Sequence, residues 1–302
     1  MLKALLNNLM KFKPFMFLDQ LIYRINEDGV FAVGAQLTYF LILSVFPFLI
    51  LFLNIVSYTP LVSQDFIIKI IYYLPLEIQI IINDFINDIV IGSSQGLLSI
   101  SAIAGIWTAS SGVKPVIKAI NRAYDYEETR SYFKIKFLSV IFTIALLFML
   151  VLVFSTLVLG ELLGRKIFSS IGKTDLFLKI WNNTRTIITL LFMVFIFALL
   201  YKYSPCVEDR KQIKLLSALP GGIFTTLGWL FTSIIFSYYV NNFASYTVTY
   251  GSIGGVIVLL VWLYISSIII VIGGEINATL EYFKINGCRV NSGKSMVSKF
   301  LD

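Results

Sequence analysis

Long apolar runs separated by short polar segments are the dominant pattern along this chain. Six runs of roughly 18 residues or more are long enough to cross the hydrocarbon core of a bilayer as helices. They lie at about 31–58, 96–120, 137–160, 186–203, 213–240 and 252–280. None alternates strictly between polar and apolar residues, as a barrel strand would, and backbone inside a bilayer must satisfy its own hydrogen bonds. The pattern predicts an all-α, polytopic membrane protein with about six transmembrane helices.

Two further segments are amphipathic and do not have the length and apolarity of a span. In 15–25, apolar residues recur at helical spacing while Asp19 and Arg24 lie off that stripe. This predicts an amphipathic helix on the inner membrane surface. The segment 61–91 holds two such patterns split by Pro75 and predicts a helical hairpin packed on the outer face. A gating lid is the alternative interpretation of the same segment.

The composition supports lipid as the solvent for most of this chain. Hydrophobic residues make up 58% and charged residues 14% of the 302 positions, and the mean hydropathy is +0.85. Soluble domains carry roughly 45–50% apolar and about 25% charged residues. We therefore expect one membrane domain over 1–302, with a cytoplasmic amphipathic arm (1–29), a six-helix bundle (30–283) and a cytoplasmic tail (284–302).

The loop charges predict the orientation. The segments before residue 31, at 114–136, at 202–214 and after residue 283 hold 18 Lys and Arg, whereas the alternate segments hold five, with Arg185 left aside. Cytoplasmic loops of membrane proteins carry the excess of Lys and Arg, so both termini are expected in the cytoplasm. The net charge of +7 is spread over these loops, which favours loop charge over a nucleic-acid partner.

Several kinds of chemistry are disfavoured by what the chain lacks. It has no histidine and only two cysteines, Cys206 and Cys288. Histidine-based triads, histidine-ligated zinc and a disulfide framework are thereby excluded. We expect no catalytic residues, no metal, no cofactor and no enzyme activity.

Polar residues inside four of the runs are the candidates for function. The first run carries Gln36, Thr38, Tyr39, Ser44 and Pro47. A proline within a span kinks its helix, and these positions either stabilise helix contacts or line a substrate path. The third run contains nothing comparable and is expected to be filler.

The second run combines small, polar and basic residues. Small residues such as Gly105 and Gly112 would let a neighbouring helix approach closely. The polar and basic candidates are Trp107, Ser110, Ser111, Lys114, Asn121 and Arg122. The first three are expected at bundle depth. Lys114, Lys118, Asn121 and Arg122 form a face that either binds an anionic lipid headgroup or only sets the topology.

The last two runs add a possible helix break and one acid. Pro220-Gly221-Gly222 implies a break or a close contact in the fifth run. Tyr250 and Gly251 precede the sixth run, which carries Glu275 and Asn277 near its inner end. Acids within membrane segments are functional candidates, and the basic residues ending the second run are the expected partners of Glu275.

The order of these motifs resembles the YihY/BrkB family of bacterial inner-membrane proteins. The matching stretches are AQLTYFLILSVFPF, GIWTASSGVKPVIKAINRAYDYEETRS, YSP, LPGG, LGW, YGSIGGVIVLLVWLY and GGEINATLE, from about residue 30 to 283. The resemblance implies a bacterial inner-membrane protein with six spans and cytoplasmic termini. Some family members carry a virulence label (virulence factor BrkB) and others an old ribonuclease label (ribonuclease BN). The residues of this chain give the ribonuclease label no support.

Two functions remain open from the sequence. The first is transport or translocation of an anionic or amphipathic envelope component such as a lipid, with membrane lipids as partners. No nucleotide-binding loop is present in the sequence, so a gradient or a partner would supply the energy. The second is a non-transporting scaffold that binds other envelope proteins, or a second copy of itself, through the 61–91 segment.

Overall fold

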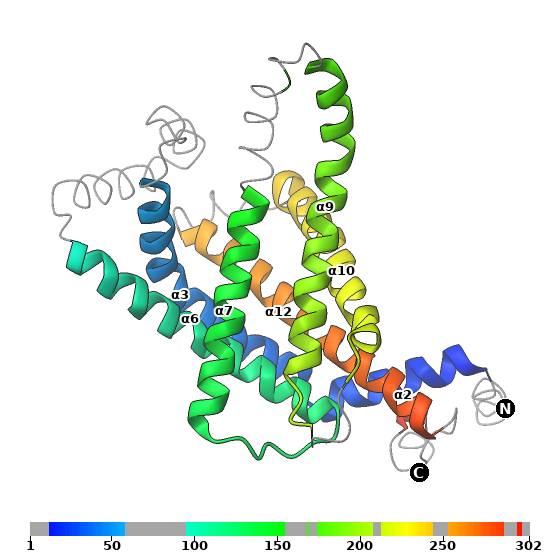
Figure 1. Cartoon of the computed structure of the whole chain (residues 1–302). Helices are drawn as coiled ribbons and strands as arrows, with labels where there is room; N and C mark the ends of the chain where they lie inside the picture. The colour runs from blue at the N-terminus through cyan, green and yellow to red at the C-terminus, as the bar shows by residue number, and fades with distance from the viewer. Residues whose placement is uncertain are drawn as a thin grey trace.

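The computed structural model describes residues 12–57, 95–154, 168, 174–207, 213–243, 253–286 and 295–297. Over these ranges the chain forms seven helices and no strand (Figure 1). They are α2 (Lys13–Glu27), α3 (Val30–Ser57), α6 (Gln95–Ala123), α7 (Tyr132–Phe154), α9 (Thr174–Tyr203), α10 (Leu215–Phe243) and α12 (Ile253–Asn286). The all-α prediction is therefore confirmed.

Each of the six apolar runs coincides with one of the long helices. The bounds agree to within a few residues at most ends, but α9 begins at Thr174, well before the predicted start of the fourth run. Within the described ranges, α7, α9, α10 and α12 are long and apolar enough to cross a membrane. The long apolar runs located the helices well because a spanning segment must be apolar on almost every face.

α12 is the central element of the bundle. It packs against α2, α3, α6 and α10, while α9 packs on α10 and α7 lies against α6. Figure 1 shows α3, α6 and α12 running obliquely, with α7, α9 and α10 more upright. The buried apolar core draws on α3, α6 and α9, with side chains such as Leu37, Ile117, Ile120, Phe197 and Tyr201.

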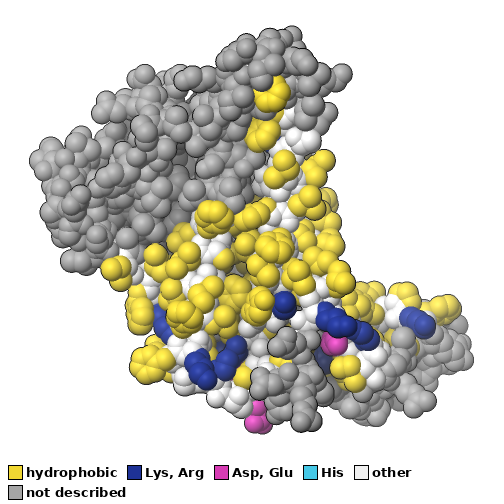
Figure 2. Space-filling view, in the orientation of Figure 1, with side chains coloured by type: hydrophobic (Ala, Val, Ile, Leu, Met, Phe, Trp, Pro, Cys, Tyr) yellow, Lys and Arg dark blue, Asp and Glu magenta, His cyan; other side chains and the backbone are white. Residues whose placement is uncertain are grey.

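The outer surface is apolar over most of its height. Large hydrophobic side chains are exposed on α7, α9 and α10, including Phe137, Leu191 and Phe231. Figure 2 shows hydrophobic side chains in a broad band, with Lys and Arg gathered at the lower end, where α2 and the end of α12 also lie. This distribution is expected of a protein whose middle contacts lipid and whose end contacts water.

The Pro220-Gly221-Gly222 sequence produces a close contact and no break. α10 continues as one helix through Pro220. A Cβ on Gly221 would collide with the carbonyl oxygen of Gly273 and with Asn277 on α12, and one on Gly222 would lie 2.8 Å from the Val194 carbonyl oxygen on α9. The glycines therefore let α10 approach two neighbouring helices at backbone distance. The small-residue prediction is likewise confirmed at Gly112, where a Cβ would lie 3.1 Å from Phe40 Cβ.

α2 confirms the predicted N-terminal amphipathic helix and fixes its orientation. Its polar side buries Asp19, Gln20 and Arg24 against the rest of the protein, while Leu18 and Ile22 are exposed. Leu18 and Ile22 of the apolar stripe thus point away from the bundle, whereas Ile25 at its end packs against the core. In a membrane protein this is the orientation that lets a surface helix place its apolar stripe in the lipid interface.

The third run lies largely in α7, where Ser139 and Thr143 are buried and bond backbone oxygens of α7 itself. Lys136, which precedes the run, is also buried and contacts α6. That the run itself is filler stays a prediction. Some of the other predictions concern residues that the structure does not describe. These are the 61–91 hairpin, Tyr250, Gly251 and the side chains of Ser44 and Pro47, although α3 itself continues as a helix through Pro47.

Candidate functional site

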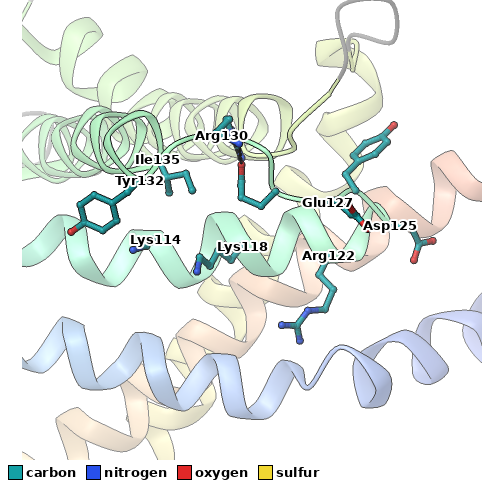
Figure 3. Close-up of a pocket in the computed structure, with 10 residues that line it drawn as sticks. Lys114, Lys118, Arg122, Asp125, Glu127, Arg130, Tyr132 and Ile135 are labelled. Carbon is teal, nitrogen blue, oxygen red and sulfur yellow. Dashed lines mark hydrogen bonds and ion pairs between the residues drawn. The ribbon is translucent and has the colours of Figure 1, made fainter.

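An open groove lies between α6 and the segment that follows it. Lys114, Lys118 and Arg122 are spaced four residues apart, so they occupy one face of α6. The groove has a volume of about 660 Å³. It is lined by Lys114, Lys118, Arg122, Asp125, Tyr126, Glu127, Glu128, Arg130, Tyr132 and Ile135. Figure 3 shows the three cations in a row along α6, with Tyr132, Ile135 and Arg130 on the opposite wall.

Two of the acids in this wall are already neutralised by arginines. Arg130 binds Glu128 through three hydrogen bonds: Nη2 to Oε2 at 2.6 Å, Nε to Oε1 at 2.7 Å and the backbone N–H to Oε1 at 3.1 Å. Partial burial alone would raise the pKa of Glu128, but the hydrogen bonds and charge of Arg130 outweigh it and hold that pKa below its ordinary value. Asp125 is paired with Arg24 of α2 at 3.2 Å.

The three cations on α6 are less strongly engaged by neighbouring groups. Lys118 is exposed and has no hydrogen bond or ion pair within the part of the chain that the structure describes. Lys114 lies over the Tyr132 ring, with Nζ 4.2 Å from its centroid. Arg122 donates to the backbone oxygen of Asp28 at 3.2 Å. The groove therefore presents a row of three cations against the exposed Glu127, which suits an anion.

Trp107, Ser110 and Ser111 lie beside the groove at the contact between α6 and α7. Lys136 Nζ donates to the Trp107 oxygen at 2.9 Å and to Ser111 Oγ at 3.1 Å, and it lies 4.3 Å from the Trp107 ring centroid. Ser110 is buried and bonds the Trp107 oxygen of its own helix. The prediction of bundle depth is wrong for Trp107, which is 55% exposed.

Asn121 hydrogen-bonds to the loop 125–131, which forms the far wall of the groove. Its Oδ1 accepts from the Cys206 backbone N–H at 2.7 Å, and its Nδ2 donates to Glu128 Oε2 at 3.4 Å. Arg130 Nη2 adds a bond to the Ser204 oxygen at 2.7 Å. These contacts hold 125–131 against the end of α9, so Asn121 shapes the groove without lining it.

Glu275 lies apart from the groove, at the junction of α12 with α2 and the end of α6. It is fully buried, and neither carboxylate oxygen has a hydrogen-bond partner within the part of the chain that the structure describes. The charges that act on it are those of Asp28, Arg24 and Asp125. The predicted partners at the end of α6 are therefore corrected: the cation beside Glu275 is Arg24, and Arg122 contacts Asp28.

Arg24 ties this junction together. Its Nη1 donates to the Ala123 oxygen, its Nη2 pairs with Asp125, and its guanidinium carbon lies 5.6 Å from the Tyr282 ring centroid. Arg24 thus connects α2 to the ends of α6 and α12. Sequence reasoning placed Arg24 only on a polar face and missed Asp28; the Asp-Gly turn at 28–29, where Gly29 has φ +63°, was the available signal.

The remaining predicted residues serve helix contacts or face outward. Thr38 donates to the Gly34 oxygen and lies 3.3 Å from Ser267 Oγ on α12. Gln36 is exposed and Tyr39 is 61% exposed. Asn277 bonds the α10 backbone beside Pro220. The predicted residues are therefore spread over several places, and only Lys114 and Arg122 line the groove.

Three polar groups that matter were not selected from the sequence. Arg130 holds the groove wall, Lys136 joins α7 to α6, and Tyr201 bonds Thr225 Oγ1 at 2.6 Å and the Ile270 oxygen at 2.7 Å. Each was counted only as loop charge or as part of an apolar run. Their partners lie 24 to 74 residues away in the chain, so no local pattern marks them.

Most of the chain matches the model of one known protein family. The model of the family described as "Virulence factor BrkB" matches residues 21–295. This chain belongs to that family. The match covers every described helix at least in part, including the whole groove and the Glu275 junction, and confirms the resemblance noted from the sequence.

The relatives of this BrkB-family chain share most of its length. A Bacillus subtilis protein named as ribonuclease-like protein YfkH is 38% identical over 88% of this chain and 95% of its own. A UPF0761 membrane protein of Pseudoalteromonas atlantica is 26% identical over 90% of this chain and 88% of its own. Another, from Psychromonas ingrahamii, is 27% identical over 86% of each. No solved structure matches the chain.

The ribonuclease-like name belongs to the Bacillus protein and is not tested for this chain. Over the described residues, no group of three or more His, Cys, Asp or Glu side chains is arranged to hold a metal ion. The absence of enzyme activity stays a prediction.

Proposed function

We propose that this protein binds the anionic headgroup of a membrane lipid in the basic groove and moves such lipids between the leaflets of the bacterial inner membrane. The observation that carries this proposal is the row formed by Lys114, Lys118 and Arg122, facing an open groove of about 660 Å³. Basic residues at a membrane surface attract anionic lipids by about 1 kcal/mol each.

The surroundings of the groove suit a lipid better than a free anion. Tyr132 and Ile135 line the wall, and the neighbouring Phe133 and Phe137 on α7 are among the most exposed hydrophobic side chains. A headgroup beside Lys118 would therefore have apolar surface close by for its acyl chains. A soluble phosphate ester would gain nothing from that surface.

The proposal includes six spans with both termini in the cytoplasm. α3 and α6 have 28 and 29 residues, which at about 1.5 Å per residue gives roughly 42 Å, enough to cross a hydrocarbon core of about 30 Å. The gathering of Lys and Arg at the end where α2 lies (Figure 2) supports a cytoplasmic position for that end.

Binding is tested first, with purified protein and vesicles. We expect it to favour vesicles of phosphatidylglycerol over those of phosphatidylcholine. Lys118→Ala should weaken that preference about fivefold, the effect of losing roughly 1 kcal/mol. Lys214→Ala is the matched control, because Lys214 is also exposed but does not line the groove. Equal affinity for the two lipids, or an equal loss in both variants, would contradict a headgroup site.

Translocation is tested separately in reconstituted vesicles. A fluorescent phosphatidylglycerol in both leaflets is bleached from outside by dithionite, and protein-containing vesicles should lose more than half of the signal. Lys118→Ala should slow this loss, and Lys214→Ala should not. Vesicles that bind lipid but lose no more signal than empty ones would refute translocation and favour the scaffold alternative.

A further inference from the structure

The carboxyl groups of the buried Glu275 and the half-buried Asp28 are neighbours at the junction of α12 with α2. Glu275 is fully buried, and its carboxylate oxygens have no donor among the neighbours that the described residues provide. The carboxyl group of Asp28, in the turn between α2 and α3, lies within hydrogen-bonding reach of it. Ionised carboxylates only accept hydrogen bonds. The two groups can therefore bond to each other only if one of them carries a proton.

The charges around Asp28 and Glu275 also favour the binding of one proton. Three carboxyl groups meet here: Asp28, Asp125 and Glu275. Two arginines face them, Arg24 from α2 and Arg122 from α6. Asp125 and Arg122 are exposed to water, whereas Glu275 is fully buried and its carboxylate has no hydrogen-bond partner within the described residues. An ionised Glu275 would therefore be a buried charge without a donor, which is costly.

The other titratable groups do not supply a further cation. Tyr124, after α6, acts on the region as a neutral phenol, because burial raises its pKa above the ordinary tyrosine value. Glu281 on α12 lies 3.8 Å from Lys284. The stretches of α3 and α10 that the structure describes place no ionisable group among the leading charges on Glu275. For Asp28, burial raises the pKa above its ordinary value, against the opposing charges of Arg24 and Arg122.

We propose that Asp28 and Glu275 together bind one proton, held as an O–H···O hydrogen bond between their carboxyl groups, and that Arg122 links this site to the basic groove. Binding forms one O–H bond and removes one negative charge from the junction; release restores it. No other reactant is required.

The link follows from the double role of Arg122. Its side chain lines the groove. It also donates to the backbone oxygen of Asp28 at 3.2 Å, and its charge acts on the Asp28 carboxyl group. An anion in the groove would draw on the same positive charge and leave the acid pair less compensated. Anion binding should therefore favour proton binding, and by linkage the reverse holds. This link rests on the proposed headgroup site, whereas the proton site does not.

Infrared spectroscopy of the purified, folded protein tests the proton site directly. A protonated carboxyl group gives a C=O band that is distinct from carboxylate and shifts in D2O. We expect this band in the difference spectrum of wild type minus Glu275→Gln at neutral pH. Asp28→Asn should also remove it, because the Asn amide supplies a permanent donor to Glu275. The control Glu281→Gln should leave the band unchanged.

Two results would overturn the shared proton. One is a difference spectrum without the carboxylic-acid band wherever the protein stays folded. The other is a band that survives unchanged in Asp28→Asn. Because Gln and Asn carry an N–H donor at the position of the proton, both variants should remain folded, and circular dichroism checks this.

The link to the groove needs a second measurement. Titration calorimetry with a soluble short-chain phosphatidylglycerol, in buffers of different ionisation enthalpy, counts the protons taken up per lipid bound. At a pH where the infrared band shows the site to be only partly protonated, we expect net uptake in wild type and none in Glu275→Gln. Equal uptake in both proteins would overturn the link. Absence of any binding would contradict the headgroup site and the link, while the infrared spectrum alone decides the proton site.

Discussion

Asn277 of α12 bridges the backbone on either side of Pro220 in α10. Its Oδ1 accepts from the Gly221 N–H at 2.7 Å, and its Nδ2 donates to the Ala218 oxygen at 3.0 Å. A proline within a helix removes one backbone donor and crowds the preceding turn. Asn277 thus reinforces α10 where Pro220 weakens it and joins α10 to α12 at the same point.

Replacing Asn277 with Ala should destabilise the protein by about 1–3 kcal/mol, because a buried donor and a buried acceptor are left unpaired. Thermal unfolding in detergent measures the loss. Asn26→Ala is the control, since Asn26 bonds only the Ile22 oxygen of its own helix at an exposed position. Equal destabilisation by the two substitutions would show that the Asn277 bridge to α10 contributes no more to stability than the exposed bond of Asn26.

The contact between α10 and α12 should be intolerant of a single methyl group. A Cβ on Gly273 would collide with Thr225 Oγ1 and with the Tyr201 ring and hydroxyl. Gly273→Ala should therefore cost about 1–3 kcal/mol through overpacking. Gly255→Ala, on the same helix with nothing within 4 Å of the new Cβ, should be neutral or stabilising by up to about 1 kcal/mol. Comparable melting temperatures for the two variants would contradict this close packing.

The wall of the groove should loosen in acid. Because Arg130 holds the folded-state pKa of Glu128 below its ordinary value, this pair stabilises the loop above the ordinary glutamate pKa. The contribution is lost as the pH falls through the lowered, folded-state pKa. Alkylation of Cys206, which contacts Thr129 of this loop at 3.2 Å, reports the opening when Cys288 is replaced by Ser.

Glu128→Gln should reproduce the acid state at neutral pH. Loss of about 1 kcal/mol, the net worth of one hydrogen bond, would raise the alkylation rate of Cys206 about fivefold. Variant and wild type are compared at the same pH, so the intrinsic pH dependence of alkylation cancels. The ratio of the two rates should approach one in acid. A ratio of one at neutral pH would show that Glu128 does not hold the loop.

Arg24 should determine whether α2 stays docked. Arg24→Gln removes the cation that pairs with Asp125 and the bond to the Ala123 oxygen, and it takes away the positive charge that acts on the buried Glu275, which is unfavourable. Hydrogen exchange of the α2 amides should speed up while exchange in α10 stays slow. Lys13→Gln, an exposed substitution in the same helix, should change neither. Unchanged exchange in α2 of the Arg24 variant would show that apolar contacts alone dock it.

The sequence located the helices because that information is local. An apolar run that crosses lipid is apolar on nearly every face, so α3, α6, α10 and α12 agree with their predicted ranges to within a few residues at most ends. The loop charges likewise predicted a basic face at Lys114 and Arg122. Glu275 was recognised as exceptional because an acid within an apolar run is costly wherever the helix packs.

The tertiary structure decided the partners. Asp28 reaches Glu275, and Arg24 reaches Asp125, across long stretches of chain. The bond of Asn277 to the α10 backbone beside Pro220 and the bond of Lys136 to the Trp107 oxygen likewise join residues far apart in the chain. The physical reason is the same in each case. The hydrophobicity of a segment follows from its own residues, whereas the partner of a hydrogen bond or of a buried charge depends on which groups folding brings together.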